Sequence, residues 1–221
     1  MNKKIKKSDI EMRKYWDKRY KKEELIYGKR HSIALKYLLK YIGKKEKILE
    51  ICGGYGRNAY FLAKKGYKIK CTEASRQAIN IGKNIYKNPN LSLEVKNALK
   101  LDYFKGAYQA VVSIYGLNSL DRKNVEKIFR NISRIVKIGG KFCNIFLSTD
   151  DVEFATGKLI AKNTFVLKDG QLVKFFTLSE IEELHRKYGF KIEKCLKIKE
   201  RRKIADKTIT SRFFLVLSRK V

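Results

Sequence analysis

The feature that most constrains the fold is a regular alternation of short apolar segments with longer amphipathic ones. The apolar segments are typical of buried strands and span residues 47–51, 68–72, 91–96, 107–114 and 141–147. Helical periodicity covers residues 57–65, 76–87 and 123–136. Strands that alternate with helices form βαβ units, so we expect an α/β fold with a Rossmann-like, doubly wound, mostly parallel sheet and helices on both faces.

Both ends of the chain depart from this alternation. Helical segments at residues 8–22 and 33–42 precede the first strand. Two strands at 191–198 and 211–218 follow each other without a helix between them. Because strands joined without a crossover pair antiparallel, we expect an antiparallel C-terminal edge strand.

Capping residues predict two helix boundaries. Ser179 with Glu182 three positions later has the spacing of a capping box, so we expect Ser179 to be the N-cap of a helix. Gly139 and Gly140 are placed to end the helix over 123–136, because glycine is favoured just past a helix C-terminus.

The composition is that of a globular domain. The chain has 221 residues, of which 44% are hydrophobic, so it can bury a core as a single domain. No stretch approaches the roughly 20 apolar residues of a membrane span, and no signal peptide is apparent. The cysteines lie far apart, which predicts no metal site and a reducing, cytoplasmic location; they are Cys52, Cys71, Cys143 and Cys195.

The charge balance is strongly basic. Lys and Arg number 52 against 22 Asp and Glu, which gives a net charge of +30. Such a charge suggests a nucleic-acid partner. However, the lysines are spread along the chain, and only residues 3–7 and 199–203 form clusters. A solvated surface that reflects composition alone is the favoured interpretation, and a nucleic-acid partner stays possible.

A glycine-rich turn over residues 52–56 follows the first strand. Glycines there let the backbone turn sharply and approach a ligand closely. No Gly-Lys-Ser/Thr follows, so the turn is not a P-loop. Taken alone, the turn leaves a nucleotide-type site and a tight structural turn equally open.

Polar side chains follow the next strands. Glu73 ends the second strand, 23 residues after Glu50, where a carboxylate can accept hydrogen bonds from ribose hydroxyls. Asn97, beside Ala98, follows the third strand and either reads the edge of an adenine or closes a turn. Tyr115, after the fourth strand, is placed to close over a ligand.

Residues 49–59, with the sequence LEICGGYGRNA, resemble motif I of the class I S-adenosylmethionine-dependent methyltransferases. Later elements of the family match in the same order, and the resemblance covers about residues 27–147. It implies that the chain binds S-adenosyl-L-methionine. The residues implied in cofactor binding are Tyr27, Glu50, Cys52, Gly53, Gly54, Arg57, Asn58, Glu73, Ala74, Asn97, Ala98 and Tyr115.

Within this class the chain is most similar to the tellurite-resistance methyltransferase-like group. The similar segments are residues 15–20, 30–32, 56–59, 168–172 and 211–213, together with Arg201. The likeness implies one methyltransferase domain over residues 1–221. In it, residues 1–46 form a helical segment that covers the cofactor site, and the insertion 148–178 forms part of the substrate side.

Three positions depart from the family pattern. Cys52 replaces the first glycine of motif I, so its side chain is expected to crowd the methionine part of the cofactor. Asn97 stands where the family has an acid, and Glu200 where relatives have a histidine before Arg201. These departures leave open a weakened cofactor site or an inactive cofactor-binding fold.

The cofactor choice depends on Glu50. Its carboxylate at the end of the first strand would repel the pyrophosphate of a dinucleotide, which disfavours a dehydrogenase. The methyl donor instead carries an α-ammonium group, which a carboxylate attracts. We therefore expect S-adenosyl-L-methionine.

We expect the acceptor to be a small, soft nucleophile, such as tellurite, selenite or a small thiol, that needs no general base. Transfer then depends on holding the nucleophile near the methyl group and excluding water. The candidate catalytic residues are His31, in the covering segment, and Arg201 and Arg212, whose forked donors suit an oxyanion.

The alternative acceptor is RNA. The loop that begins at Tyr115 contains no proline, unlike the loop used to methylate the amino group of adenine, and no cysteine lies beside a proline for attack on cytosine C5. A ribose or a ring nitrogen remains possible, so an RNA methyltransferase that uses the basic surface stays open.

Overall fold

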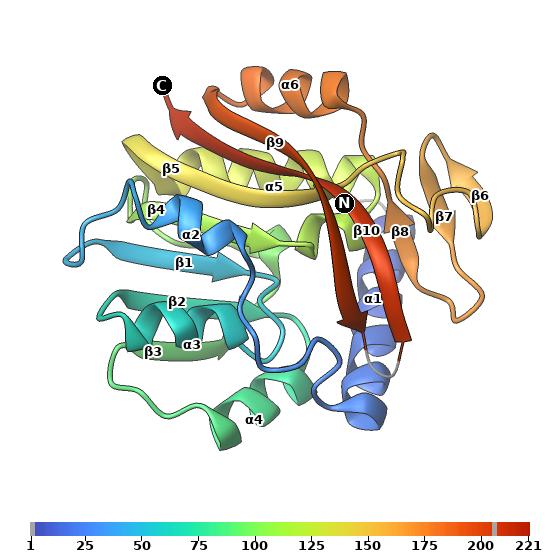
Figure 1. Cartoon of the computed structure of the whole chain (residues 1–221), viewed down its shortest axis with the longest axis horizontal. Helices are drawn as coiled ribbons and strands as arrows, with labels where there is room; N and C mark the ends of the chain where they lie inside the picture. The colour runs from blue at the N-terminus through green and yellow to red at the C-terminus, as the bar shows by residue number, and fades with distance from the viewer. Residues whose placement is uncertain (1–2, 205–206) are drawn as a thin grey trace.

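The computed structural model describes the backbone of residues 3–204 and 207–221, and a seven-stranded sheet forms its centre (Figure 1). The strand order is β3-β2-β1-β4-β5-β10-β9. The strands are β1 Lys47–Ile51, β2 Lys68–Glu73, β3 Leu91–Val95, β4 Tyr108–Ile114, β5 Val136–Leu147, β9 Phe190–Ile204 and β10 Lys207–Lys220. The first five strands are parallel, while β10 pairs antiparallel with β5 and β9. This confirms the expected doubly wound sheet with an antiparallel C-terminal edge.

Helices cover both faces of the sheet (Figure 1). On one face α2 (Ala34–Leu38) and α3 (Arg57–Lys64) pack on the sheet through apolar side chains, and on the other α5 (Arg122–Ile135) and α6 (Leu178–Lys187) do so. The helix α2 is shorter than the expected segment 33–42. Two further helices, α1 (Lys3–Glu23) and α4 (Arg76–Ile85), contact each other. The described residues also form two 3-10 turns, η1 (Ala98–Lys100) and η2 (Gly116–Ser119). No helix in the described ranges is long and apolar enough to cross a membrane.

The prediction that Gly139 and Gly140 end a helix is wrong. The helix α5 ends at Ile135, and both glycines lie inside β5, where its pairing with β4 is irregular. Gly139 has a φ of +78°, and a Cβ on Gly140 would lie 2.7 Å from the carbonyl oxygen of Gln109. The glycines therefore allow β5 to approach β4 closely.

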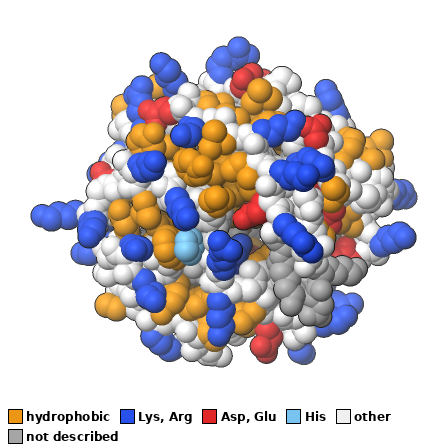
Figure 2. All heavy atoms as spheres, viewed as in Figure 1, with side chains coloured by type: hydrophobic (Ala, Val, Ile, Leu, Met, Phe, Trp, Pro, Cys, Tyr) orange, Lys and Arg blue, Asp and Glu red, His pale blue; other side chains and the backbone are white. Residues whose placement is uncertain are grey.

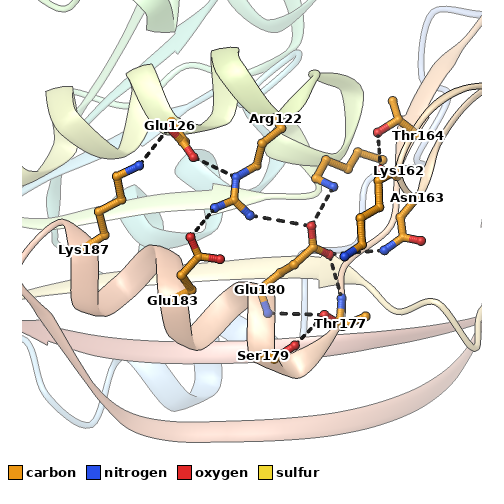
Figure 3. Close-up of polar contacts among 11 residues, drawn as sticks. Arg122, Glu126, Lys162, Asn163, Thr164, Thr177, Ser179, Glu180, Glu183 and Lys187 are labelled. Atoms are coloured by element: carbon orange, nitrogen blue, oxygen red, sulfur yellow. Dashed lines mark hydrogen bonds and ion pairs between the residues drawn. The ribbon is translucent and has the colours of Figure 1, made fainter.

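The predicted capping box of α6 is also displaced by two residues. Thr177 is the N-cap: its side chain accepts from the Glu180 backbone N–H at 3.2 Å, and Glu180 accepts from the Thr177 N–H at 3.2 Å. The sequence contains both spacings, so local pattern does not choose between them. The ion pair of Glu180 with the buried Lys174, at 3.2 Å, and its contact with Arg122 favour the observed register (Figure 3).

The insertion 148–178 forms a small antiparallel sheet of β6 (Lys158–Ala161), β7 (Thr164–Val166) and β8 (Leu172–Lys174). Its Phe165 and Val173 belong to the same apolar core as the buried side chains of α2 and α3. The Asn118 side chain donates to the Lys174 carbonyl oxygen at 3.1 Å, so the insertion supports the loop that follows β4.

The last two strands extend beyond the main sheet. Residues 213–219 of β10 pair with β5, whereas residues 207–212 pair only with the end of β9. We call this projecting pair, residues 199–204 and 207–212, the hairpin arm. In Figure 1 it reaches toward α1, and Ile204 packs against the apolar cluster that contains Tyr20 and Tyr55.

The corrected cap of α6 can be tested with two alanine variants. Thr177→Ala should lower the free energy of unfolding by about 1 kcal/mol, the typical cost of losing an N-cap. Ser179→Ala is the matched control and should change it by less than about 0.5 kcal/mol. Denaturant unfolding measures both, and an equal or larger effect at Ser179 would contradict the assigned register.

Candidate active site

All twelve residues that the resemblance implies in cofactor binding line one cavity at the carboxyl ends of β1, β2 and β4. We call it the glycine-turn cavity, because the turn after β1 forms its floor. Parallel strands end at the same edge of the sheet, which brings side chains from distant parts of the sequence together here.

The glycines of the turn are held in tight contacts. A Cβ on Gly53 would lie 2.4 Å from the Cys71 sulfur, and one on Gly54 would lie 2.6 Å from the Tyr20 hydroxyl. Gly54 also has a φ of +59°. The turn therefore needs glycine at both positions to keep its backbone close to the cavity.

Glu50 is a buried carboxyl beneath the turn, with 1% of its surface exposed. It accepts hydrogen bonds from the Asn58 side chain and from the Ala59 backbone N–H, both at 3.0 Å, at the start of α3. Burial raises the pKa of Glu50 to about 7, although these hydrogen bonds oppose the shift. Near neutral pH its charge is therefore sensitive to the surroundings.

Glu73 lies at the end of β2 and is also largely buried. Its two oxygens accept from the backbone N–H groups of Gly54, at 3.2 Å, and Ser75, at 3.0 Å. Burial raises the pKa of Glu73 while these hydrogen bonds lower it. A carboxylate has about four acceptor positions, so these backbone contacts leave acceptor capacity for a ligand.

Asn97 lines the cavity and also closes a turn. Its Oδ1 accepts from the Leu99 backbone N–H at 2.9 Å and caps η1. The sequence left turn closure and ligand contact as alternatives, and the structure shows that turn closure occurs at a cavity wall.

Cys52 occupies an unusual backbone position, with a φ of +51°. A Cβ on Gly116 would lie only 2.4 Å from the Cys52 Cβ, so the glycine after β4 makes room for this side chain. Burial, followed by the nearby carboxylates of Glu73 and Glu50, raises the pKa of the Cys52 thiol. These surroundings disfavour the thiolate, which is the nucleophilic form of cysteine.

The helix α1, part of the segment 1–46 that was expected to cover the cofactor site, forms a wall of the glycine-turn cavity. Met12, Arg13, Trp16 and Tyr20 line it. Trp16 and Tyr20 are four residues apart and so share one face of the helix, but the sequence did not assign them to the site. The helix is held by Asp17, which accepts from the Ser75 hydroxyl at 2.6 Å.

A second cavity adjoins the first, and Tyr27, Arg57 and Tyr115 line both. We call it the basic cavity, because five of the described residues that line it are cationic. Its other walls come from residues 25–33 and from the hairpin arm at Glu200 and Arg201. A group bound there lies next to the contents of the glycine-turn cavity.

Hydrogen bonds fix the wall between the cavities. Asn58 accepts from the Ser32 backbone N–H at 2.9 Å, and Tyr55 donates to the Gly28 carbonyl oxygen at 2.6 Å. Tyr115 has a φ of +63°, a costly conformation for a residue with a side chain, and it contacts Phe213 edge-on.

His31 and Arg201, two of the predicted catalytic residues, line the basic cavity. The His31 ring stacks on Phe61 with centroids 3.5 Å apart. Burial, together with neighbouring cations, lowers the pKa of His31, so its imidazole is neutral near pH 7.

Arg212 and the insertion lie elsewhere. Arg212 is a diagonal neighbour of Arg201 in the hairpin arm, but it lines neither cavity, and its guanidinium donates to the Asp150 carbonyl oxygen at 3.3 Å. The expected pair of arginines is therefore not brought together in one cavity. Among the described residues, none from 148–178 lines either cavity.

The basic charge is distributed over the surface. Figure 2 shows Lys and Arg side chains spread over the whole face that carries α2 and α3, including the surroundings of the one histidine visible in this view. Lys29, Arg30 and Lys36 at the basic cavity are exposed.

The fold, the glycine turn and the two adjoining cavities define a class I S-adenosylmethionine-dependent methyltransferase. Residues 23–194 match the family model described as a methyltransferase domain. Because the match covers most of the chain, the protein belongs to this family of methyltransferases.

Curated relatives act on different acceptors. The chain is 28% identical over 207 residues to the tRNA N(3)-methylcytidine methyltransferase trm141 of Schizosaccharomyces pombe, covering 84% of this chain and 82% of the relative. It is 27% identical to the ubiquinone/menaquinone biosynthesis C-methyltransferase UbiE of Zymomonas mobilis (58% and 54%). It is 26% identical to the tRNA N(3)-cytidine methyltransferase METTL2 of Danio rerio (71% and 47%).

Solved structures share the fold. A SAM-dependent methyltransferase from Methanosarcina mazei superposes with a TM-score of 0.72 at 19% identity, covering 84% of this chain and 97% of that one. A Burkholderia thailandensis 1,6-didemethyltoxoflavin-N1-methyltransferase, solved with bound S-adenosylhomocysteine, gives 0.65 at 14% identity, covering 85% and 76%. S-adenosylmethionine is accordingly the cofactor of this chain.

The raised pKa of Glu50 predicts a pH-dependent stability. Between pH 4.5 and about 7 the folded chain keeps a proton on Glu50 that the unfolded chain has lost. Hence this group makes the free energy of unfolding decrease as the pH rises through that window. Glu50→Gln should flatten this part of the profile, measured by denaturant unfolding at several pH values. An unchanged slope, equal to that of the exposed control Glu182→Gln, would contradict the assignment.

The fit of Cys52 against Gly116 predicts a coupled pair. Gly116→Ala should destabilise the fold by about 1–3 kcal/mol, the usual cost of overpacking. Cys52→Gly removes the side chain that the new methyl group meets, so it should reduce this penalty, and donor affinity should stay equal or tighten. A double-mutant cycle by denaturant unfolding measures the coupling, and strictly additive effects would overturn this account.

Proposed function

We propose that this methyltransferase modifies a ring nitrogen of cytidine in RNA, with the acceptor nucleotide in the basic cavity. The observation that carries the proposal is the position of that cavity: it is lined by cations and shares Tyr27, Arg57 and Tyr115 with the cavity of the glycine turn. A nucleotide brings a flat base and a phosphate, and the cavity offers aromatic and cationic side chains for both.

For the cofactor, we propose that Glu73 accepts hydrogen bonds from the ribose hydroxyls with its remaining acceptor capacity. Glu50 attracts the α-ammonium group, and Asn97 with Ala98 lies against the adenine. The tight packing of Gly53 and Gly54 supports a close backbone approach to the cofactor. S-adenosylmethionine supplies an activated methyl group there.

The N-terminal segment 1–46 acts as the cover of this site in our proposal. The contacts of α1 support it, because Trp16 and Tyr20 line the cavity and Asp17 joins α1 to the start of α4. The insertion 148–178 contributes to the substrate side indirectly, by supporting the loop after β4 through Asn118.

The relatives favour RNA over the tellurite-like acceptor expected from the sequence. Two of the three curated relatives are tRNA cytidine methyltransferases, and one of them matches 82% of its own length. The position of Arg212 outside the cavities weakens the case for a forked oxyanion site.

The chemistry of cytosine suits the residues of the basic cavity. N3 of cytosine carries a lone pair and no proton, so its methylation needs no general base. His31 is stacked and surrounded by cations, so in this proposal it shapes the cavity and takes no proton. Tyr27 and Tyr115 offer rings on which a base can stack.

A methyl-transfer assay with isotopically labelled donor tests the function. We expect label in bulk tRNA, in N3-methylcytidine after digestion, and none in tellurite, selenite or small thiols. Label in a small molecule and none in RNA would overturn the proposal in favour of a small-molecule enzyme.

The charge contribution is tested with paired lysine variants. Lys29→Ala with Lys36→Ala removes two cations of the basic cavity, so the slope of log affinity for tRNA against log salt should fall by roughly 1–2. The matched control is Lys44→Ala with Lys45→Ala, exposed before the opposite end of β1. An equal loss in both pairs would mean that the basic cavity has no special part in binding.

A further inference from the structure

One carboxylate lies among the cations of the basic cavity. Glu200, on the hairpin arm, is the single acidic residue among the described residues that line this cavity. Within the residues whose side chains the structure describes, Glu200 forms no ion pair or hydrogen bond. The cations that line the same cavity are Lys29, Arg30, Lys36, Arg57 and Arg201.

This lack of a partner distinguishes Glu200 from other carboxylates of the same region. Glu193, earlier on β9, pairs with Lys141 and Arg219, and Asp150 pairs with Lys197. In a chain with a net charge of +30, a carboxylate beside cations normally finds one of them. With respect to the side chains that the structure describes, Glu200 is instead left with its acceptor oxygens available to a ligand in the cavity.

The position of Glu200 is fixed by the hairpin arm. It lies opposite Ser211 in β10, at a register held by the long β9–β10 pairing. The cavity that it lines extends to Tyr115, which also borders the glycine-turn cavity. A planar base in the basic cavity can therefore contact the carboxylate and still face the methyl donor.

We propose that Glu200 accepts a hydrogen bond from the exocyclic amino group of the acceptor cytosine and offsets the positive charge that the base gains. This rests on the proposed function. Cytosine presents an amino donor at C4, whereas uracil presents an oxygen acceptor there, which a carboxylate repels. Glu200 thus selects cytosine and orients its N3.

The charge balance of the reaction gives Glu200 its second role. The N3 lone pair of cytosine forms the new N–C bond while the S–C bond of the donor breaks, and that electron pair stays on sulfur. No proton leaves, so positive charge passes from the sulfonium to the base. A fixed carboxylate beside the base stabilises this developing cation, where the surrounding cations alone would oppose it.

The test compares Glu200→Gln and Glu200→Ala on a tRNA that the wild type methylates. Glutamine keeps an acceptor oxygen but loses the charge, so we expect kcat to fall about 10-fold, while the Kd for tRNA stays equal or tightens because a negative charge has left a cationic cavity. Alanine also loses the hydrogen bond, so kcat should fall about 100-fold. The affinity for the methyl donor should match that of the wild type in both variants.

The control is Glu182→Gln, which removes an exposed carboxylate on α6 that lines neither cavity. It should leave kcat and the Kd for tRNA unchanged, and thermal unfolding verifies that all variants fold. Wild-type kcat in both Glu200 variants would overturn the inference but leave the proposed function standing. A wild-type enzyme that transfers no methyl group to RNA would instead overturn the proposed function, and the inference with it.

Discussion

The hydrogen bonds of the buried Glu50 carboxyl hold together the segments that line both cavities. It receives hydrogen bonds from Asn58 and Ala59, which joins the end of β1 to the start of α3. The other side of the same Asn58 amide holds the backbone of Ser32, in the segment that walls the basic cavity. One buried amide–carboxyl pair thus ties a strand, a helix and a distant loop together, and loss of either member would leave a buried polar group without its partner.

The site also concentrates backbone strain and tight packing. Cys52 and Tyr115 adopt positive φ angles. Each is followed by a glycine with no space for a Cβ: Gly53 packs against Cys71, and Gly116 packs against Cys52. Such conformations persist only where the surrounding contacts determine them strongly, and they cluster where a ligand must be approached closely. Cys52 stands at the position of the first motif I glycine, and Gly116 in the loop after β4 provides the space that its side chain needs.

Much of the fold could be predicted from the sequence, because segments with helical periodicity alternate clearly with buried apolar strands. The carboxyl ends of parallel strands also lie at one edge of the sheet. The resemblance to motif I named twelve residues from distant parts of the chain, and this convergence explains why they line one cavity. The rest depended on tertiary contacts. By local sequence, Thr177 and Ser179 are equally suitable N-caps, and the ion pair of Glu180 with the buried Lys174 favours Thr177. Likewise, Trp16 lines the cavity only because α1 packs against the domain, where Asp17 holds it. The length of β9 was underestimated because residues 199–203 are all charged and lack the apolar alternation of a strand.

We propose that the two cavities form one active site, with the donor on the glycine turn and a cytidine beside Tyr115. The most direct test is an experimental structure with S-adenosylhomocysteine and a short cytidine-containing RNA. We expect the ribose of the cofactor at Glu73 and the cytosine in the basic cavity, with N3 facing the cofactor sulfur and the amino group at Glu200. A cytosine bound outside the basic cavity, or a cofactor ribose away from Glu73, would contradict it.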